Sequence, residues 1–463
     1  MSERTLDQRT ELQGLSTAVL LPSIDVFEEA GRKAVDPLTP IVGVALFQRT
    51  VLTLQRAGIR QLIVVSGAEE DQLKQALARG PHVSIPVRWM PLREFPLDDP
   101  RTWESLAAEV RGFCLLSGVG SVFSRSLIEQ LRQDVQAGQA AIVLPPSSER
   151  RLPEAWVHEA ASDASSAIAD LIVLPAKELN AVGRLAGELD AVPIGRWLQR
   201  AAMDGRVRAM ITNDPAHWYQ PVVTPADLRQ AERRLFSSLK GECEGFVDRY
   251  FNRKLSRWFT RVFVVLGWSP NLITIMATII GLVSAAAFGV GTYAAGVGAA
   301  LLFQLAAVID CSDGEVARLT FTESPFGAWL DIAMDNLVHM AIFGGIAVGA
   351  YWRALGSDQA WIPLALGGAA ILGNLLSFAL VSKAQKIKTA GEWKTPLDAA
   401  WSDFMLKNVA SRDFSVVVLL FALFAKLDTF LWIAAIGSMV FAGVMVWIVR
   451  PSAIFVRSSR PPA

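Results

Sequence analysis

A group of polar residues between Asp310 and Asp335, set in otherwise apolar sequence, constrains this chain more than any other feature. Its members are Asp310, Asp313, Gly314, Ala317, Arg318, Gly327, Asp331 and Asp335. On an α-helix the first five, at offsets 0, 3, 4, 7 and 8, share one face, and so do the last three, at offsets 0, 4 and 8. We therefore predict two helices that point four carboxylates, one guanidinium and two glycines into a common space.

The apolar surroundings make these acids energetically costly. A charged side chain in the hydrocarbon region of a membrane costs about 2.5 to 3.5 kcal/mol on insertion scales. Four aspartates are tolerable there only beside compensating cations or in a polar cavity. Divalent metal ions are the natural compensation, because they bind carboxylate oxygens well.

The spacing D-x2-D-G-x2-A-R-x8-G-x3-D-x3-D resembles the signature of the CDP-alcohol phosphatidyltransferase family, and all eight fixed positions are present. A second segment, SPNLIT at 269–274, is similar to the start of the family's first membrane helix. The resemblance covers residues 245 to 455. It implies transfer of a substituted phosphate from a CDP-linked alcohol to a second alcohol, with release of CMP.

The resemblance also implies roles for these residues. Two Mg²⁺ or Mn²⁺ ions are expected on the four aspartates, Asp310, Asp313, Asp331 and Asp335. The CDP moiety is expected to contact Asp313, Gly314, Ala317, Arg318 and Gly327. Asp335 is the candidate catalytic base, because it is the last of the series and lies nearest the bilayer interior.

The membrane part is predicted to be all-α, with six transmembrane helices. The chain is 52% hydrophobic and 19% charged, and its long apolar runs lie near 272–290, 294–309, 326–351, 360–381, 413–425 and 429–449. The fifth run is the doubtful one, since a dozen residues cover only about 18 Å of a core about 30 Å thick. It either begins earlier, near Lys407, or is re-entrant.

Basic residues predict the orientation of these spans. With six spans, fifteen Lys and Arg residues fall on cytoplasmic segments and only Arg353 and Lys426 fall outside. Both termini and the acid site are therefore expected to face the cytoplasm, in the inner or cytoplasmic membrane. No apolar run follows MSERTLDQRT, so no cleavable signal peptide is expected.

The first half is predicted to be an α/β domain of nucleotidyltransferase-like (Rossmann-like) type. Short apolar runs typical of buried parallel strands occur at 17–21, 61–65, 112–116, 141–144 and 171–174, with helical patterns at 44–57 and 124–137. The segment 36–58 resembles nucleotidyltransferases that make CDP- or UDP-activated headgroups. We place the domains at 1–240, a juxtamembrane amphipathic connection at 241–261, the membrane domain at 262–455 and a tail at 456–463.

The chemistry of that nucleotidyltransferase-like domain is predicted to be silent. The loop at 22–28 is acidic and lacks the glycines that would cradle a triphosphate. The family's lysine position falls on Asp36, one metal aspartate falls on Val119, and the other falls among Gln220–Val222. Without these groups little stabilises charge on a transferring nucleotide. Residual cytidylyltransferase activity is the alternative.

Two competing functions are open to the membrane domain. An ion or proton transporter would also use buried acids, whereas a noncatalytic scaffold would be expected only if the membrane acids were missing. His339, one turn beyond Asp335, is either a relay or metal ligand or a packed helix residue. The segment 252–257 either anchors the chain at the membrane surface or contacts substrate.

The fused architecture looks like that of inositol-phosphate synthases. The donor is expected to be CDP-diacylglycerol or CDP-inositol, and the acceptor inositol 1-phosphate, with glycerol phosphate, serine and choline left open. The expected partners are the lipid bilayer and a second copy of the chain in a homodimer, and nucleic acid is not among them.

A phosphorylated acceptor predicts basic residues that bind its phosphate. Lys383 and Arg412 flank the loop between the fourth and fifth runs, where basic residues exceed acidic ones. We expect Arg412→Ala to weaken acceptor binding by about 1.5 to 3 kcal/mol, the scale of a charge-assisted hydrogen bond. The measurement is the acceptor KM of Arg412→Ala and Lys383→Ala at saturating donor. Unchanged values, or a preference for free inositol, would leave this loop with a topological role alone.

Overall fold

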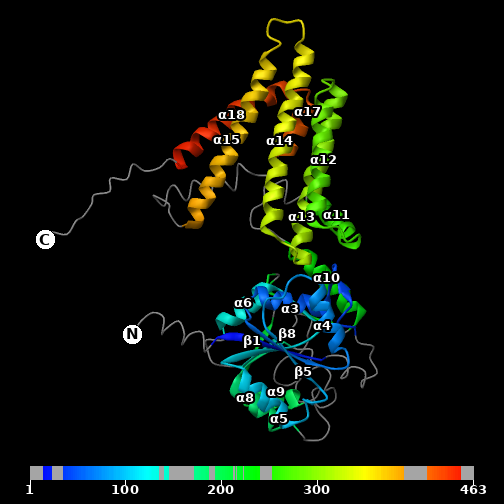
Figure 1. Cartoon of the computed structure of the whole chain (residues 1–463), viewed down its shortest axis with the longest axis vertical. Helices are drawn as coiled ribbons and strands as arrows, with labels where there is room; N and C mark the ends of the chain where they lie inside the picture. Colours follow the sequence, from blue (N-terminus) through cyan, green and yellow to red (C-terminus); the bar gives the residue numbers. More distant parts are fainter. Residues whose placement is uncertain are drawn as a thin grey trace, which may run out of the picture. The chain divides into compact units, whose positions relative to one another are not determined.

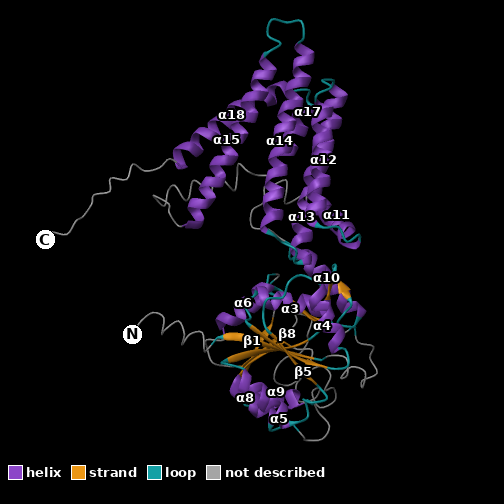
Figure 2. Cartoon of the chain, in the orientation of Figure 1, coloured by secondary structure: helices purple, strands orange, loops and turns teal. Residues whose placement is uncertain are grey.

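The computed structural model describes residues 14–22, 35–134, 140–144, 171–186, 193–211, 214, 216–222, 224–239, 253–390 and 414–449. The chain divides into two compact units, Met1–Lys240 and Gly241–Ala463, and each is described by itself. Figure 1 follows the chain by colour, and Figure 2 shows strands in the first unit and helices alone in the described part of the second.

The first unit is built on a seven-stranded sheet with the order β10-β8-β9-β6-β1-β4-β5. The strands are β1 (Leu15–Leu21), β4 (Gln61–Ser66), β5 (Val87–Pro91), β6 (Phe113–Gly118), β8 (Ala140–Leu144), β9 (Leu171–Pro175) and β10 (Val207–Ile211). All neighbouring pairs are parallel except those of β9, which is antiparallel to both β6 and β8. Two small antiparallel pairs join β2 (Pro40–Ile41) to β3 (Val44–Ala45) and β7 (Ser121–Phe123) to β11 (Tyr219–Pro221).

Helices cover both faces of this sheet (Figure 2). They are α3 (Leu46–Arg56), α4 (Glu70–Arg79), α5 (Pro100–Glu109), α6 (Arg125–Asp134), α8 (Ala176–Gly183), α9 (Pro193–Met203) and α10 (Pro225–Ser237). One core contains Trp103 of α5 and Trp197 of α9, and the core on the opposite face contains Phe47 of α3 and Leu127 of α6. The layered α/β architecture expected from the sequence is confirmed.

The five predicted strands correspond to β1, β4, β6, β8 and β9, but the expectation that all are parallel is wrong for β9. Its residues Leu171–Leu174 are all buried. A continuous apolar run reports burial on both faces and not strand direction, which explains the error. The mixed sequences of β5 and β10 gave no such signal, and those two strands were not predicted.

The second unit consists of helices in its described residues. They are α11 (Arg253–Val265), α12 (Pro270–Phe288), α13 (Tyr293–Thr320), α14 (Pro325–Ala354), α15 (Ile362–Ala390), α17 (Phe414–Leu423) and α18 (Leu427–Val449). Five of them, α12, α13, α14, α15 and α18, are long and apolar enough to cross a membrane. The unit therefore has the composition of a multi-pass membrane protein.

The fifth apolar run, 413–425, forms α17, an apolar helix of only ten described residues. At 1.5 Å per residue it reaches about 15 Å, roughly half of a bilayer core. Residues 391–413 lie outside the described part of the chain, so an earlier start near Lys407 stays a prediction.

Local sequence signals set the helix ends that matter for the acids. Ser269 and Ser324 accept hydrogen bonds from the third residues of α12 and α14, and each is followed by a proline at the first helical position. Helix α13 ends at Phe321, which has a left-handed φ of 60°. Only residues 321–324 join α13 to α14, and α12 packs against both of these helices.

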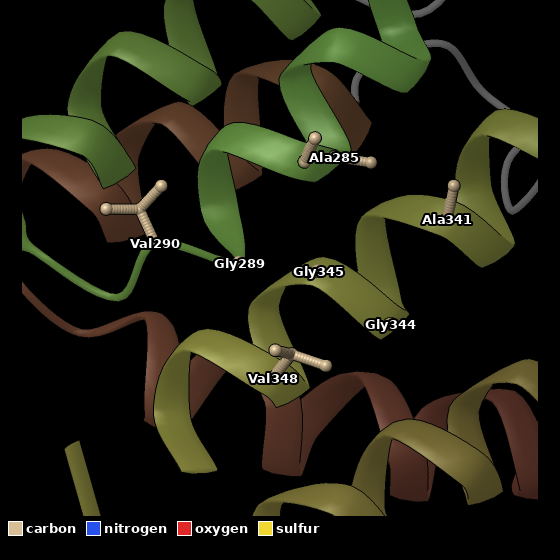
Figure 3. A pocket seen from close by; sticks show the side chains of 8 residues that line it. Ala285, Gly289, Val290, Ala341, Gly344, Gly345 and Val348 are labelled. Carbon is tan, nitrogen blue, oxygen red and sulfur yellow. The ribbon is translucent and has the colours of Figure 1, made fainter. Parts of the chain in front are cut away.

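Helices α12 and α14 approach closely through glycines of α14. A Cβ atom at Gly345 would lie 2.1 Å from the carbonyl oxygen of Ala285, and one at Gly349 would lie 2.2 Å from that of Phe288. Figure 3 shows the open groove of about 540 Å³ beside this contact. Its lining is Ala285, Ala286, Gly289, Val290, Ala341, Gly344, Gly345 and Val348. No side chain in this lining is titratable, so the groove is a consequence of packing.

Adjacent glycines of α14 give a matched test of this packing. We expect Gly345→Ala to destabilise the membrane unit by about 1 to 3 kcal/mol, because its methyl group would overlap the α12 backbone. Gly344→Ala is the control, since the nearest atom to its Cβ would be Ile371 Cδ1 at 3.9 Å. The measurement is the thermal unfolding midpoint in detergent. Equal midpoints for the two variants would contradict the close approach.

Candidate metal centre

Three of the four predicted metal ligands come together in space. Asp310, Asp313 and Asp331 each offer a carboxylate oxygen, and these atoms all lie within 4.8 Å of one another. The first two lie in the last three turns of α13, and Asp331 lies in the second turn of α14. Helices α13 and α14 are joined at residues 321–324 and both pack against α12, so acids a few turns from the connection approach one another across the space between the two helices.

The geometry fits a bound divalent ion. Carboxylate oxygens bind Mg²⁺ at about 2.0–2.1 Å and Ca²⁺ at about 2.3–2.6 Å, so oxygens that share an ion lie up to about 4 to 5 Å apart. Asp310 and Asp313 are 8% and 5% exposed, and Asp331 is half-buried. Such close carboxylates repel one another strongly unless a cation lies between them.

The fourth predicted ligand, Asp335, does not belong to this group of three. It lies one turn beyond Asp331 on the same face of α14 and is half-buried. This placement keeps Asp335 on the side of α14 that carries Asp331.

Both oxygens of Asp313 accept hydrogen bonds from the protein. The hydroxyl of Thr274 in α12 donates to one oxygen, and the backbone N–H of Gly314 donates to the other. Such partners fix the orientation of a metal-ligating carboxylate. The sequence pattern marked the segment 269–274 but gave Thr274 no role at the site. The one signal that could have indicated this role is that Thr274 places a hydroxyl group in the first turns of an apolar helix.

The two glycines of the motif keep space beside polar groups. A Cβ atom at Gly327 would lie 3.1 Å from both Asn271 Oδ1 and Ser324 Oγ. A Cβ atom at Gly314 would lie 3.3 Å from a guanidinium nitrogen of Arg318, whose side chain is exposed. Gly314 and Arg318 therefore form one surface of α13, and Asn271 joins the site as a residue to which the sequence pattern assigned no role.

His339 packs among aromatic rings. Its ring centroid lies 4.9 Å from that of Phe414 and 6.1 Å from that of Phe303, both edge-on. This environment favours the packed helix residue over the relay or metal ligand. His339 is also outside the group of three carboxylates, in which no histidine takes part.

The structure describes one of the two predicted acceptor residues, Lys383, and not the other, Arg412. Lys383 is exposed near the end of α15. It follows Asn374 by nine residues, which places it about half a turn away round the helix. Asn374 itself faces α14, where its side-chain amide donates to Asn336 Oδ1 at 3.2 Å. Arg412 lies outside the described residues.

The first unit lacks metal carboxylates where its resemblance would require them. Val119 is 1% exposed and belongs to the apolar core, and Gln220 is 4% exposed with its Nε2 donating to the carbonyl oxygen of Pro221. Asp36 accepts a hydrogen bond from the backbone N–H of Leu38 and so stabilises a turn. The loop at 23–34 lies outside the described residues.

One buried cation of the first unit, Arg49, binds backbone carbonyl oxygens. The guanidinium of Arg49 donates to the carbonyl oxygens of Ile41 and Val42 at 3.0 and 3.2 Å. Burial, followed by repulsion from Arg56, lowers the pKa of Arg49 to about 9. With 2% of its surface exposed, Arg49 stabilises the turn at Val42, where φ is 50°.

Comparison with known proteins agrees with the signature. Residues 268–456 match the family model described as CDP-alcohol phosphatidyltransferase. The C-terminal region is therefore a CDP-alcohol phosphatidyltransferase domain. It contains all the residues of the carboxylate group and the hydroxyl of Thr274.

Two curated relatives are named bifunctional IPC transferase and DIPP synthase. The one from Aquifex aeolicus is 31% identical over 40% of this chain and 41% of its own length, so the match spans about two fifths of that relative. The one from Rubrobacter xylanophilus is 27% identical over 80% of this chain and 84% of its length. The second match extends well into residues 1–240.

Among solved structures, UDP-glucose pyrophosphorylase from Acinetobacter baumanii is similar, with 12% identity over 47% of this chain and 92% of that chain and a TM-score of 0.32.

The carboxylate group predicts metal binding in the purified full-length protein. We expect Mn²⁺ to bind, and Asp310→Asn, Asp313→Asn and Asp331→Asn each to weaken binding at least about tenfold by removing a ligand. The measurement is the electron paramagnetic resonance signal of free Mn²⁺. Asp358→Asn, an exposed acid after α14, is the matched control. Equal affinity in all four variants would contradict the assignment.

Proposed function

We propose that this chain is an integral membrane CDP-alcohol phosphotransferase that moves a substituted phosphate from a CDP-linked donor to an alcohol acceptor and releases CMP. The observation that carries the proposal is the group Asp310, Asp313 and Asp331, formed by residues of a signature that also matches the family model. A transporter would need buried acids but not the Gly314-to-Arg318 surface beside them.

The three clustered aspartates would hold Mg²⁺ or Mn²⁺, and two ions are proposed if Asp335 also ligates. Bound metal supplies charge neutralisation for the donor diphosphate and the leaving CMP. Arg318 would contact phosphate from the surface of Gly314, and the small residues Ala317 and Gly327 would let the nucleotide approach the helices.

Asp335 is the proposed base. Its carboxylate would take the proton of the acceptor hydroxyl as that oxygen forms a bond to the phosphorus of the alcohol-bearing phosphate. The phosphoanhydride bond then breaks and its electron pair leaves with CMP. Asp335 lies outside the group of three carboxylates, and as a base it would offer the acceptor hydroxyl a carboxylate oxygen that no metal ion holds.

The proposed acceptor is inositol 1-phosphate, with CDP-inositol or CDP-diacylglycerol as the donor. Support comes from relatives named IPC transferase and DIPP synthase, one of which matches this chain through both of its units. Glycerol phosphate, serine and choline are the competing acceptors. We place the protein in the cytoplasmic membrane as a homodimer, with its termini and site facing the cytoplasm.

The deciding experiment is a CMP-release assay of the purified full-length protein over a matrix of CDP-linked donors and alcohol acceptors. The proposal expects release only in the presence of metal, with inositol 1-phosphate as the best acceptor. Full turnover in excess chelator would refute the metal-dependent mechanism. Preference for a non-phosphorylated acceptor would refute the substrate assignment alone.

We expect Asp335→Asn to lower the transfer rate at least about a hundredfold, the scale of a lost general base. The affinity for CDP should change little, because Asp335 lies outside the group of three carboxylates. The measurements are single-turnover CMP release and calorimetric CDP binding with metal present. Asp358→Asn serves again as control. Normal turnover by Asp335→Asn would assign the base to another group.

A bifunctional protein is the second candidate, because the named relatives carry two activities. The buried Val119 and Gln220 argue against it, since neither side chain offers a carboxylate to a metal ion. We propose that residues 1–240 contribute stability, docking or oligomerisation.

This role predicts that the full-length protein releases no pyrophosphate from CTP and inositol 1-phosphate. The missing metal ligands are the physical reason. The measurement is a coupled pyrophosphate assay, run with Asp335→Asn so that the transferase consumes no product. Pyrophosphate above background would make the chain bifunctional.

A further inference from the structure

Glu315 is a buried carboxylate that the metal centre does not use. It lies two residues after Asp313 in α13 and is 3% exposed. At 3.6 residues per turn it points about 160° away from Asp313 and about 140° away from Asp310. Helix α13 therefore carries acids on two opposite sides.

The side of Glu315 faces α11. Ser256 Oγ donates to one carboxylate oxygen of Glu315 at 3.0 Å, and Thr260 Oγ1 donates to the other at 2.6 Å. Both hydroxyl residues are 0% exposed and lie one turn apart on α11. The hydroxyl of Ser312 also donates to the backbone carbonyl oxygen of Ser256 at 3.3 Å. The two helices are thus joined by polar contacts on either side of Asp313 in the sequence.

Apolar packing surrounds this polar contact. Phe263 of α11 packs in one core with Ile309 and Val316 of α13. Apolar packing alone tolerates small rotations of one helix against another, whereas two hydroxyls on two carboxylate oxygens specify one rotation and one register. A carboxylate left without these donors would be buried at considerable cost, so the contact is difficult to open.

We propose that Glu315 is a positioning residue of the metal centre. Its carboxylate fastens α11 across the back of α13, and this contact holds the backbone of Asp313 where Thr274 and Asp331 meet it. The Asp313 segment is then fixed from α11 on one side and from α12 on the other. This inference rests on the proposed function only in taking the aspartates as metal ligands.

A native cysteine reports on the contact without any metal. Cys311 is 7% exposed and lies one turn before Glu315 on the same side of α13. With Cys114→Ser and Cys243→Ser it is the sole thiol of the full-length chain. We expect Glu315→Ala, and the double variant Ser256→Ala with Thr260→Val, to raise its rate of maleimide labelling at least about tenfold by freeing α11.

Conservative changes and a control sharpen this comparison. Glu315→Gln keeps one acceptor oxygen and should label close to the parent rate, and Thr260→Val should label at an intermediate rate. Glu323→Gln, an exposed acid in the turn after α13, should label at the parent rate. If Glu315→Ala does not fold, the Gln and Thr260→Val variants carry the test. Parent-like labelling of Thr260→Val and of the double variant would overturn the contact.

Mn²⁺ binding to the same purified variants tests positioning. We expect the Kd to rise about 10- to 100-fold in Glu315→Ala and in the double variant, the usual range for supports of metal ligands. The number of bound ions should not change. Combining Glu315→Ala with Ser256→Ala and Thr260→Val should weaken Mn²⁺ binding little further, because all three residues form one contact. Glu315→Gln should recover most of the affinity.

Each other result has a definite meaning. Faster labelling at unchanged Kd would show that Glu315 only packs α11, and a lower number of bound ions would make it a ligand. Both results overturn the proposal. Absence of Mn²⁺ binding in the parent would refute the metal centre of the proposed function and with it the positioning role, whereas the labelling rates would still decide whether Glu315 fastens α11.

Discussion

The electrostatic cost of carboxylates in apolar helices governs the membrane unit. Asp310, Asp313 and Asp331 would repel one another wherever they met, yet the packing of α13 and α14 against α12 brings their carboxylate oxygens within 4.8 Å of one another. Ser324 and the proline after it begin α14 at a fixed place. A cation bound at this point would relieve the repulsion, and the surrounding helices hold the acids in place for it.

Rigid support around the acids comes from two neighbouring helices, α12 and α11. Helix α12 supplies the Thr274 hydroxyl to Asp313 and approaches α14 closely at Gly345. Helix α11 is joined to the opposite side of α13 through Glu315. Each contact acts on a backbone segment and not only on a side chain. A metal ligand is held to within a fraction of an ångström only when its helix cannot rotate, which these contacts together prevent.

The first unit buries side chains without carboxylates at positions where the sequence resemblance expects metal ligands. Its described residues form a seven-stranded sheet with two apolar cores, while Val119 and one of the residues 220–222 stand where the resemblance calls for metal carboxylates. The buried cation Arg49 donates its hydrogen bonds to backbone carbonyl oxygens. Fold stability depends on buried apolar surface, whereas catalysis depends on a few polar groups, and our proposal that this unit is catalytically silent rests on that difference.

The sequence by itself determined the division into two units, the positions of five of the seven strands of the main sheet and of the long helices, and three carboxylates that meet. Periodicity and composition carry that information because burial repeats along each element. It could not give the direction of β9, because burial does not depend on direction. Nor could it find Thr274 or Glu315, whose partners lie 39 and more than 50 residues away in the chain. Only tertiary packing decides which distant hydroxyl meets which acid, and so which residues support the site.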